Sequence, residues 1–227
     1  MKIGFVVTAH WSDEYRKQGG FFLERFCNSL LEHCSYNFKV YVVDNASTYP
    51  LPQFDVAQYI RIEDQTIEGI TGAWNRGLHT AYSDGCNILV NCNDDLWFNS
   101  TLNIFLAKLV KSNNSNIVYS ALTNGVLGGP HLSRGPRAGV TNMPCTNWHN
   151  VINGFFFGLT RSHYEQFRYT ETEYFPQQHA YNEGDGKWGG QEGYWIELAK
   201  KGVSGLIINE AFVEHTKLRG WKQLKNL

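Results

Sequence analysis

The feature that most constrains the fold is an alternation of strand-like and helix-like segments along the first half of the chain. Short apolar runs with many β-branched residues predict buried strands at 3–8, 38–43, 57–62, 87–93 and 117–121. Apolar residues at helical spacing predict helices at 20–33, at 101–112 and in a segment that ends near Ser83. Strand–helix–strand units favour parallel strands joined by right-handed connections. We therefore expect an α/β fold with a mostly parallel central sheet flanked by helices.

The second half of the chain is less regular. The stretch 123–150 is rich in glycine and proline, and we expect it to be a long loop of the kind that is often functional. Beyond it, the same patterns predict strands at 153–159 and 206–208, a further apolar run at 212–215, and helices at 161–167 and 191–201. A length of 227 residues favours a single domain, 1–227, which we divide into the halves 1–121 and 122–227.

Composition excludes several classes of protein. The formal net charge of -1 provides no basic field, so we expect no nucleic-acid partner. No apolar run is long enough for a transmembrane segment, and residues 3–7 are typical of a first strand rather than of a signal peptide. The five cysteines show neither CxxC nor zinc-binding spacing, which indicates reduced thiols in a cytoplasmic protein.

An acidic pair, Asp94 and Asp95, directly follows the strand predicted at 87–93. The carboxyl ends of the strands form the ligand crevice of an open parallel sheet. Carboxylates at that place can hold a hard divalent cation, and the cation can neutralise a diphosphate. The alternative is structural, since either aspartate could be the N-cap of the following helix. The residues alone leave both interpretations open.

Two other polar segments border the same predicted crevice. Asp44 ends the strand at 38–43, where it could accept a hydrogen bond from a ligand or shape a turn. The segment Gly69–Leu78 places glycines at the opening of a helix, where backbone N–H groups can approach an anion closely. Asn75 in this segment could contact a ligand, or it could cap or brace its own helix.

Taken together, these segments resemble the motifs of GT-A glycosyltransferases of family 2, in the order in which the family carries them. The residues that carry the resemblance are Val42–Ser47, Gly72–Gly77, Asn93–Asp95, Asn153–Phe157, Trp188–Glu192 and Val213–His215. The segment Trp188–Glu192 is similar to the WGGED box of relatives of β-1,4-galactosyltransferases, with Gln191 at the first acidic position. It also resembles a signature of retaining N-acetylgalactosaminyltransferases.

The resemblance implies a GT-A fold with a Rossmann-like, nucleotide-sugar-binding half at 1–121 and an acceptor-binding, catalytic half at 122–227. It implies a metal-dependent, inverting enzyme that moves a sugar from a nucleotide-diphosphate donor to a hydroxyl of a glycan or glycoconjugate. Asp95 and His215 would then bind Mn²⁺ or Mg²⁺, since mixed carboxylate and imidazole ligation suits these ions. Glu192 would be the general base that deprotonates the acceptor.

The resemblance also assigns residues to the donor. Asp44, with Thr8 beside it, would contact the nucleotide base, and Asp94 would bond the ribose or the sugar. Asn75 would lie near the donor. Four aromatic residues of the irregular segments could form a wall for the acceptor sugar, or they could be satellite core: Trp148, Tyr174, Tyr181 and Trp188. The loop from Gly125 to Gly139 could close over the donor.

Each assignment has an alternative. A lone histidine such as His215 is often only a hydrogen-bonded structural residue, and Glu192 could be a first-turn glutamate that the helix dipole favours. At the level of function, one alternative is a non-catalytic nucleotide-sugar or carbohydrate-binding module, which Gln191 would suit. Another is a sugar-phosphate nucleotidyltransferase. Such an enzyme would need a basic glycine-rich loop after the first strand, where this chain has Ala9–Ser12.

Overall fold

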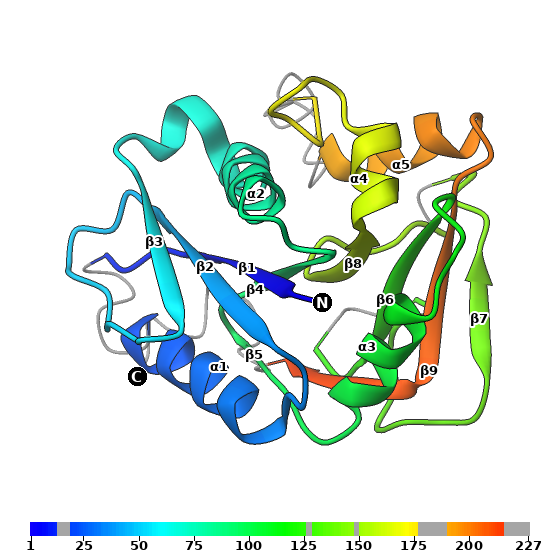
Figure 1. The fold of residues 1–227 in the computed structure, drawn as a ribbon, viewed down its shortest axis with the longest axis horizontal. Coiled ribbons are helices and arrows are strands. Elements are labelled where there is room, and N and C mark those ends of the chain that lie inside the picture. Colours follow the sequence, from blue (N-terminus) through cyan, green and yellow to red (C-terminus); the bar gives the residue numbers. More distant parts are fainter. Residues whose placement is uncertain (13–18, 126–128, 148–149, 177–189, 216–227) are drawn as a thin grey trace.

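The computed structural model describes residues 1–12, 19–125, 129–147, 150–176 and 190–215 (Figure 1). In this part of the chain a nine-stranded sheet has the order β3-β2-β1-β4-β8-β6-β9-β5, with β7 paired to β9. The strands are β1 Ile3–Ala9, β2 Phe38–Asn45, β3 Ala57–Ile62, β4 Ile88–Asn93, β5 Leu96–Trp97, β6 Ile117–Thr123, β7 Val140–Met143, β8 Phe156–Thr160 and β9 Ser204–His215. The helices are α1 Gly19–His33, α2 Gln65–Ser83, α3 Leu102–Val110, α4 Arg161–Phe167 and α5 Gly190–Ala199.

The direction of the strands brings most of their carboxyl ends to one edge. Strands β3, β2, β1 and β4 are parallel, as the sequence predicts. Strand β8 is antiparallel to both β4 and β6, so β6 runs in the same direction as β4, and β9 is parallel to β6. We call the edge where β1, β2, β3, β4, β6 and β9 end the carboxyl edge, and the opposite one the amino edge. The α/β fold predicted from the sequence is confirmed.

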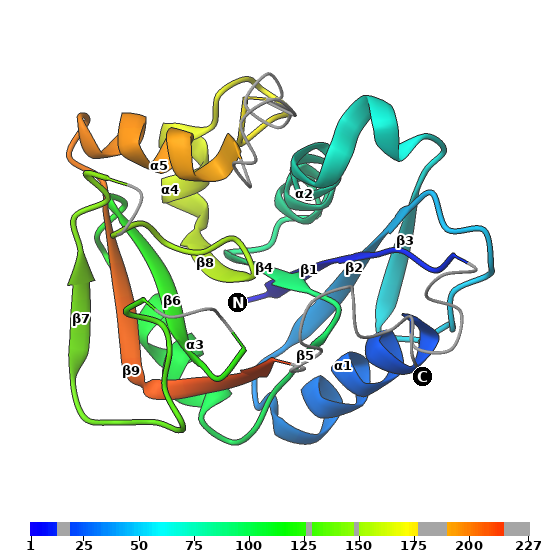
Figure 2. The same cartoon turned by 180° about the vertical axis from the view of Figure 1, so that it is seen from behind.

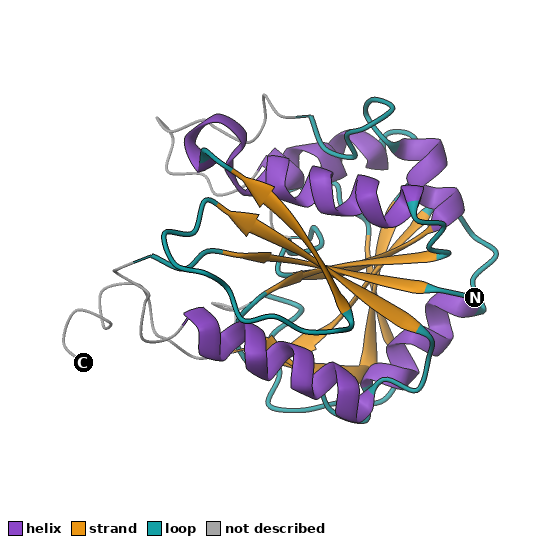
Figure 3. Cartoon of the chain, turned by 60° about the vertical axis from the view of Figure 1, so that its left-hand side comes forward, coloured by secondary structure: helices purple, strands orange, loops and turns teal. Residues whose placement is uncertain are grey.

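Helices cover both faces of the parallel strands (Figure 3). Successive strand residues point to opposite faces, which separates two cores. On one face Phe5 packs in the cluster that contains Phe26 of α1, and on the other face Val6 packs in the cluster that contains Leu78 of α2. Helix α2 lies very close to the sheet, since a Cβ on Gly77 would meet Val6 Cγ1 at 2.2 Å. This glycine therefore lets α2 pack closely on β1 and β2.

The structure differs from the sequence prediction in the segment 123–150, which contains a strand. Strand β7 pairs antiparallel with β9, with Val140 opposite Ile208. Its four residues, Val-Thr-Asn-Met, are too few to show a period, and this strand depends on hydrogen bonds to a distant partner rather than on its own pattern. Helix α2 also begins earlier than expected, at Gln65, and Gly69, with φ 59° and ψ -167°, interrupts it.

Strand β9 joins two segments that the sequence separates. The residues 206–208 and 212–215 both belong to it, while Asn209, Glu210 and Ala211 have no partners in the register with β6. At this irregularity the strand bends, and its last part runs along the bottom of the molecule toward β5 (Figure 2). Leu96 of β5 then pairs with His215, so β9 carries its carboxyl end to the end of β4.

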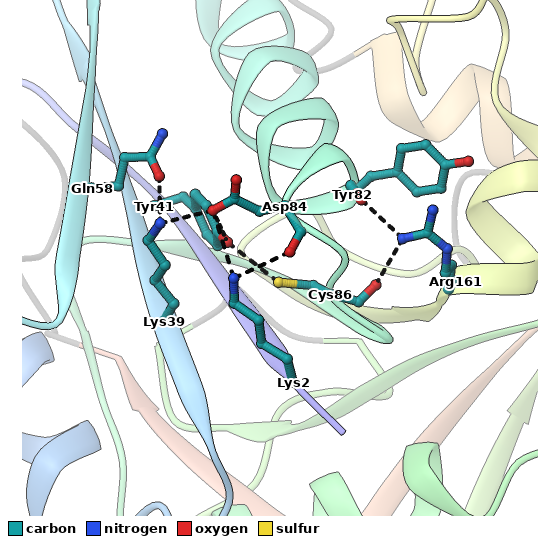
Figure 4. Close-up of polar contacts among 8 residues, drawn as sticks. All are labelled: Lys2, Lys39, Tyr41, Gln58, Tyr82, Asp84, Cys86 and Arg161. Atoms are coloured by element: carbon teal, nitrogen blue, oxygen red, sulfur yellow. Dashed lines mark hydrogen bonds and ion pairs between the residues drawn. The ribbon is translucent and has the colours of Figure 1, made fainter.

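A polar network closes the amino edge (Figure 4). Asp84, after α2, accepts hydrogen bonds from Lys39 Nζ at 2.7 Å and from Tyr41 Oη at 2.9 Å, and Lys2 Nζ lies 3.6 Å from the same oxygen. These contacts lower the pKa of Asp84, with the Lys39 bond as the largest cause. Across the edge, Arg161 of α4 donates to the carbonyl of Tyr82 at 2.9 Å. The network ties β1, β2, α2 and α4 together.

Two further predictions concern the environment of the protein. None of the described helices is long and apolar enough to cross a lipid bilayer. All five cysteines are free thiols. Burial raises the pKa of Cys27 to about 12 and that of Cys92 well above its ordinary value. Because the thiolate is the nucleophilic form, Cys92 beside the acidic pair is chemically inert, and we assign it a packing role.

Candidate active site

Asp95 and His215, which are far apart in the sequence, meet at the carboxyl edge. Asp95 Oδ2 lies 3.0 Å from His215 Nε2, and the two side chains are 27% and 14% exposed. The contact forms because β5, which follows Asp95, pairs with the end of β9. The structure therefore brings together the two residues that the sequence assigned to one metal ion.

The acidic pair does not cap a helix. Asp94 and Asp95 form a turn between β4 and β5, and the N-cap of α3 is Thr101, which makes no side-chain capping bond. The structural alternative that the sequence left open for this pair is therefore wrong, because β5 separates the pair from the helix. The protein around Asp94 displaces water from its carboxylate, and this, with the neighbouring Asp95, raises its pKa well above the ordinary value.

Three residues to which the sequence assigned no role at His215 hold this histidine in place. Its backbone N–H donates to Asn124 Oδ1 at 2.9 Å. Its ring stacks on Phe155, with centroids 5.6 Å apart and an angle of 13° between the planes. A Cβ on Gly125 would lie 2.3 Å from His215 Cβ, so only glycine fits there. The requirement for glycine arises from a contact between distant segments, so a local sequence pattern could indicate it only as one loop glycine among several.

Phe155 contacts a second histidine. The ring of His131 meets it edge-on, with the centroids 5.8 Å apart, and Asn153 Nδ2 lies 3.3 Å from His131 Nδ1. Burial lowers the pKa of His131 to about 4, so the ring is neutral at physiological pH. The N–H of Asn93 donates to the carbonyl of Phe155 at 2.9 Å, which joins this aromatic residue to the end of β4. The motif Asn153–Phe157 therefore contributes a wall beside the Asp95–His215 pair.

Asp44 lies at the same edge, at the end of β2. Its Oδ2 accepts from Arg61 Nη1 at 2.6 Å, and its Oδ1 accepts from the N–H of Ser47 at 3.0 Å. The second bond shapes the turn, in which Ala46 has a φ of 57°, a conformation that a non-glycine residue seldom adopts. Such strained turns often occur at binding sites. Asp44 thus shapes a turn, as one alternative predicted, at the carboxyl edge of the sheet.

Some buried polar atoms at the carboxyl edge find no hydrogen-bond partner among the described residues. They are Thr8 Oγ1, Asn45 Oδ1 and His215 Nδ1. Thr8 pairs with Asn93 in the register of β1 and β4, so its hydroxyl belongs to the neighbourhood of the acidic pair. Buried polar groups are normally satisfied, and those that are not point to a ligand or an ordered water. The arrangement suits a polar ligand bound across the ends of β1, β2 and β4.

Asn75 has a different position from the one the sequence suggested. The residue is 2% exposed, and its side chain bonds to the backbone of Tyr174 and Phe175 rather than reaching the crevice or its own helix turn. Asn75 therefore has the bracing role that one alternative predicted, but the backbone that it braces belongs to a distant segment and not to its own helix. Tyr174 is fully buried and belongs to an aromatic core, so it does not line an acceptor wall. Trp148, Tyr181 and Trp188 lie outside the described residues.

The catalytic candidate Glu192 is described only by its backbone. It lies in the first turns of α5, and its side chain lies outside the described part, as does most of the box Trp188–Glu192. The sequence predicted that the loop 125–139 could act as a lid. The structure describes this loop except for residues 126–128. It is anchored by a bridge between Thr123 and Leu132.

The carboxylate and imidazole of Asp95 and His215 fit a divalent cation. They are a mixed oxygen and nitrogen donor pair, already in contact and open to solvent on one side. No group of three or more His, Cys, Asp or Glu side chains suited to a metal occurs among the residues that the structure describes. The chain would therefore supply a partial ligand set, and the remaining positions would belong to a bound ligand and to water.

Comparison with known families identifies the chain. The model of the family described as Glycosyl transferase family 2 matches residues 20–167, well over half of the 227 residues. The chain belongs to glycosyl transferase family 2. The match covers β2, the opening of α2, the acidic pair and β8, so the motifs from Val42–Ser47 to Asn153–Phe157 lie inside it. No curated protein sequence matches this family 2 chain.

Solved structures confirm the GT-A fold. TarS residues 1–349 from S. aureus is 14% identical, with a TM-score of 0.59 over 95% of this chain and 60% of that one. The same protein in complex with UDP-GlcNAc is 15% identical, with a TM-score of 0.61 over 100% and 61%. GalNAc-T7 with UDP, GalNAc and Mn²⁺ is 16% identical, with a TM-score of 0.63 over 97% and 45%. This family 2 chain thus spans about half to three fifths of the length of these proteins.

Proposed function

We propose that the protein transfers a sugar from a nucleotide-diphosphate donor to a hydroxyl of a glycan or glycoconjugate acceptor, with a divalent metal ion and with inversion at the anomeric carbon. Residues 1–121 bind the nucleotide sugar, and residues 122–227 supply acceptor binding and catalysis. The observation that carries the proposal is the 3.0 Å contact between Asp95 and His215 at the carboxyl edge of a family 2 sheet.

Asp95 and His215 are the proposed ligands of the metal. Their direct contact brings a carboxylate oxygen and an imidazole nitrogen together, and Asn124, Gly125 and Phe155 hold the imidazole toward Asp95. When Mn²⁺ or Mg²⁺ is bound there, it supplies Lewis-acid stabilisation of the negative charge on the leaving diphosphate. The similar structure of GalNAc-T7 was solved with UDP and Mn²⁺, which favours Mn²⁺ as the ion.

The donor is proposed to lie across the ends of β1, β2 and β4. Asp44 and Thr8 would contact the base, and Asp94 would bond the ribose or the sugar. Support comes from the unpartnered hydroxyl of Thr8 and from the Arg61 contact, which holds the Asp44 carboxylate at the crevice.

Glu192 is the proposed general base. It would take the proton of the acceptor hydroxyl while the oxygen attacks the anomeric carbon from the face opposite the diphosphate. A positioned base contributes about 10²–10⁴-fold to the rate. Gln191 precedes it, so Glu192 is the acidic residue of the box that remains for this role.

The proposal is tested by incubating the purified protein with Mn²⁺ and a panel of nucleotide sugars, starting with UDP-GlcNAc, which the similar TarS structure contains. Release of the nucleoside diphosphate and the anomer of the product are measured by NMR. We expect metal-dependent turnover with an inverted product anomer. Binding of donors with no turnover, unchanged by Glu192→Gln, would instead support a non-catalytic binding module.

A further inference from the structure

We propose that Asn75 of α2 is a positioning residue for catalysis: it fixes helix α5, and with it Glu192, against the nucleotide-binding half. The inference rests on the proposed function for the role of Glu192, but its structural part does not. Asn75 lies in α2, which packs on β1 and β2, whereas α5 belongs to the other half of the chain. A connection between these two elements would decide how the base faces the donor.

The first part of the connection is a set of hydrogen bonds to the backbone. Asn75 Oδ1 accepts from the N–H groups of Tyr174 at 3.0 Å and of Phe175 at 2.8 Å. Asn75 Nδ2 donates to the carbonyl of Phe175 at 2.7 Å. All three bonds are buried, so none of these backbone groups has water as an alternative partner. The amide of Asn75 therefore fixes Tyr174 and Phe175 to α2.

The second part is aromatic packing between this segment and α5. The ring of Phe175 lies 5.2 Å from that of Trp195 and 5.9 Å from that of Tyr194. Tyr174 contacts the same two rings, at 5.7 Å and 5.8 Å. Tyr194 and Trp195 are both buried residues of α5. Helix α5 therefore packs directly on the two residues that Asn75 holds.

Glu192 is one helical turn before Trp195, so a shift of Trp195 moves the backbone of Glu192 with it. Tyr174 has a further anchor, because its hydroxyl lies 2.6 Å from His163 Nε2 of α4. That anchor leads to α4, in the same half of the chain as α5. Helix α4 is also bonded to α2, through Arg161 and the carbonyl of Tyr82. Asn75 is thus the direct polar link, among the described residues, between the Tyr174–Phe175 segment and α2, and through α2 to the strands that end at the donor site.

The chemistry of the contact requires asparagine. Two N–H groups need an acceptor and one carbonyl needs a donor, and a short primary amide satisfies all three. Aspartate would keep the acceptor but place a second oxygen against the carbonyl of Phe175, and alanine would leave all three groups unsatisfied. Serine keeps a smaller polar group at this position, so Asn75→Ser is the milder variant if Asn75→Ala does not fold.

The chain also contains a matched control, Asn103 of α3. Its Nδ2 donates to the carbonyl of His33 at 2.7 Å, and its Oδ1 accepts from the N–H of Ser35 at 3.0 Å. Like Asn75, it braces backbone of a distant segment with both ends of its amide. It does so between α3 and the end of α1, away from α5. Asn103→Ala therefore removes a brace of the same chemistry, more exposed than that of Asn75 and far from α5.

The test has two arms on the full chain. In the first, hydrogen exchange measured by mass spectrometry compares Asn75→Ala, Asn75→Ser and Asn103→Ala. For the Asn75 variants we expect hydrogen exchange in peptides covering Tyr194–Leu198 to be at least roughly tenfold faster than in wild type, because local opening of α5 becomes easier. Peptides of β1 report any change in global stability, and the effect on α5 should exceed the effect on β1. Asn103→Ala should leave the α5 peptides unchanged. Equal exchange of α5 in all variants would overturn the inference, whether or not the protein is active.

In the second arm, turnover of a donor by the Asn75 variants should fall by roughly 10- to 100-fold in kcat, since a small misplacement of a catalytic group has effects of this size. Binding of UDP with Mn²⁺ should stay within about twofold of wild type, because Asn75 does not contact the donor. Weaker UDP binding with unchanged kcat would instead identify a donor contact and overturn the inference. An inactive wild type would contradict the proposed function, and the exchange arm would still decide the position of α5.

Discussion

Polar side chains lie at both edges of the parallel sheet, but their hydrogen bonding differs. At the amino edge, Asp84, Lys39 and Tyr41 bond to one another, and none of these side chains has a buried atom without a partner. At the carboxyl edge, buried atoms of Thr8 and Asn45 lack hydrogen bonds among the described residues. Because an unsatisfied buried polar group destabilises a fold by about 1–3 kcal/mol, a ligand that bonds to Thr8 and Asn45 would recover part of this free energy.

The comparison predicts that changes at the carboxyl edge mainly affect turnover and binding, while changes at the amino edge mainly affect stability. The largest effect is expected for Glu192→Gln. If Glu192 is the general base of the crevice, kcat falls about 10²–10⁴-fold with UDP binding unchanged. Glu197→Gln, an exposed residue of the same helix, is the control and should keep wild-type kcat. Nearly full activity of Glu192→Gln would remove the catalytic role.

The second effect concerns the packing that holds His215. A methyl group at Gly125 would overlap with three atoms of His215 at 2.3–2.5 Å, so Gly125→Ala must displace the imidazole. We expect binding of UDP in the presence of Mn²⁺ to weaken roughly tenfold, while binding without metal is unchanged. The control is Gly135→Ala in the same loop, where an added Cβ meets nothing within 4 Å. Equal affinities of both variants for UDP with Mn²⁺, measured by calorimetry, would show that Gly125 does not hold His215 in this way.

The third effect is a pH dependence of stability from His163, near the amino edge. Its Nδ1 faces the carbonyl of Ser115 and its Nε2 faces Tyr174, and burial lowers its pKa from 6.5 to about 4. Between these values the unfolded chain binds a proton that the folded chain does not, so stability falls as the pH falls from 6.5 to 4 and is complete above 6.5. The difference amounts to at most about 3 kcal/mol.

His163→Gln should abolish this part of the pH dependence. The measurement is urea unfolding of wild type and variant at pH 7, 5.5 and 4. The free energy of unfolding of the wild type should decrease more steeply than that of the variant. Parallel curves would mean that His163 titrates in the folded state as it does in the unfolded chain.

The smallest effect is expected for Asp84→Asn at the amino edge. The side chain of Asp84 is 35% exposed, so the loss of its contacts with Lys39 and Lys2 should destabilise the protein by less than about 1 kcal/mol. UDP binding and kcat should equal those of wild type. Activity and thermal unfolding are measured on the same preparation. A change in kcat would contradict the claim that the amino edge affects stability and not turnover.

The sequence predicted most of the fold because strands and helices of the first half carry their own period. Strand β7 could not be predicted, since its polar residues form a strand only by pairing with β9. The bend of β9 at residues 209–211 could not be predicted from the sequence either, because it depends on the register between β9 and β6. These are tertiary effects that local propensity does not contain.

The candidate site was predicted in part. The resemblance to the family pointed to Asp95 and His215, and the structure places them in contact. The residues that hold His215 were not predicted, because the need for Asn124, Gly125 and Phe155 arises only when β6, β8 and β9 come together. Asn75 lay in a predicted motif, but its partners in the segment of Tyr174 and Phe175 are a hundred positions away along the chain.

The central claim is that Asp95 and His215 bind one metal ion that also holds the donor diphosphate. Calorimetric titration of UDP into wild type, Asp95→Ala, His215→Ala and the double variant, with and without Mn²⁺, tests it directly. With Mn²⁺ we expect each single variant to weaken binding at least roughly tenfold and the double variant to weaken it little further, because residues that act on one ion are not additive. Without Mn²⁺ all four proteins should bind alike. Binding by the wild type that is independent of Mn²⁺, or losses that simply add in the double variant, would contradict the shared site.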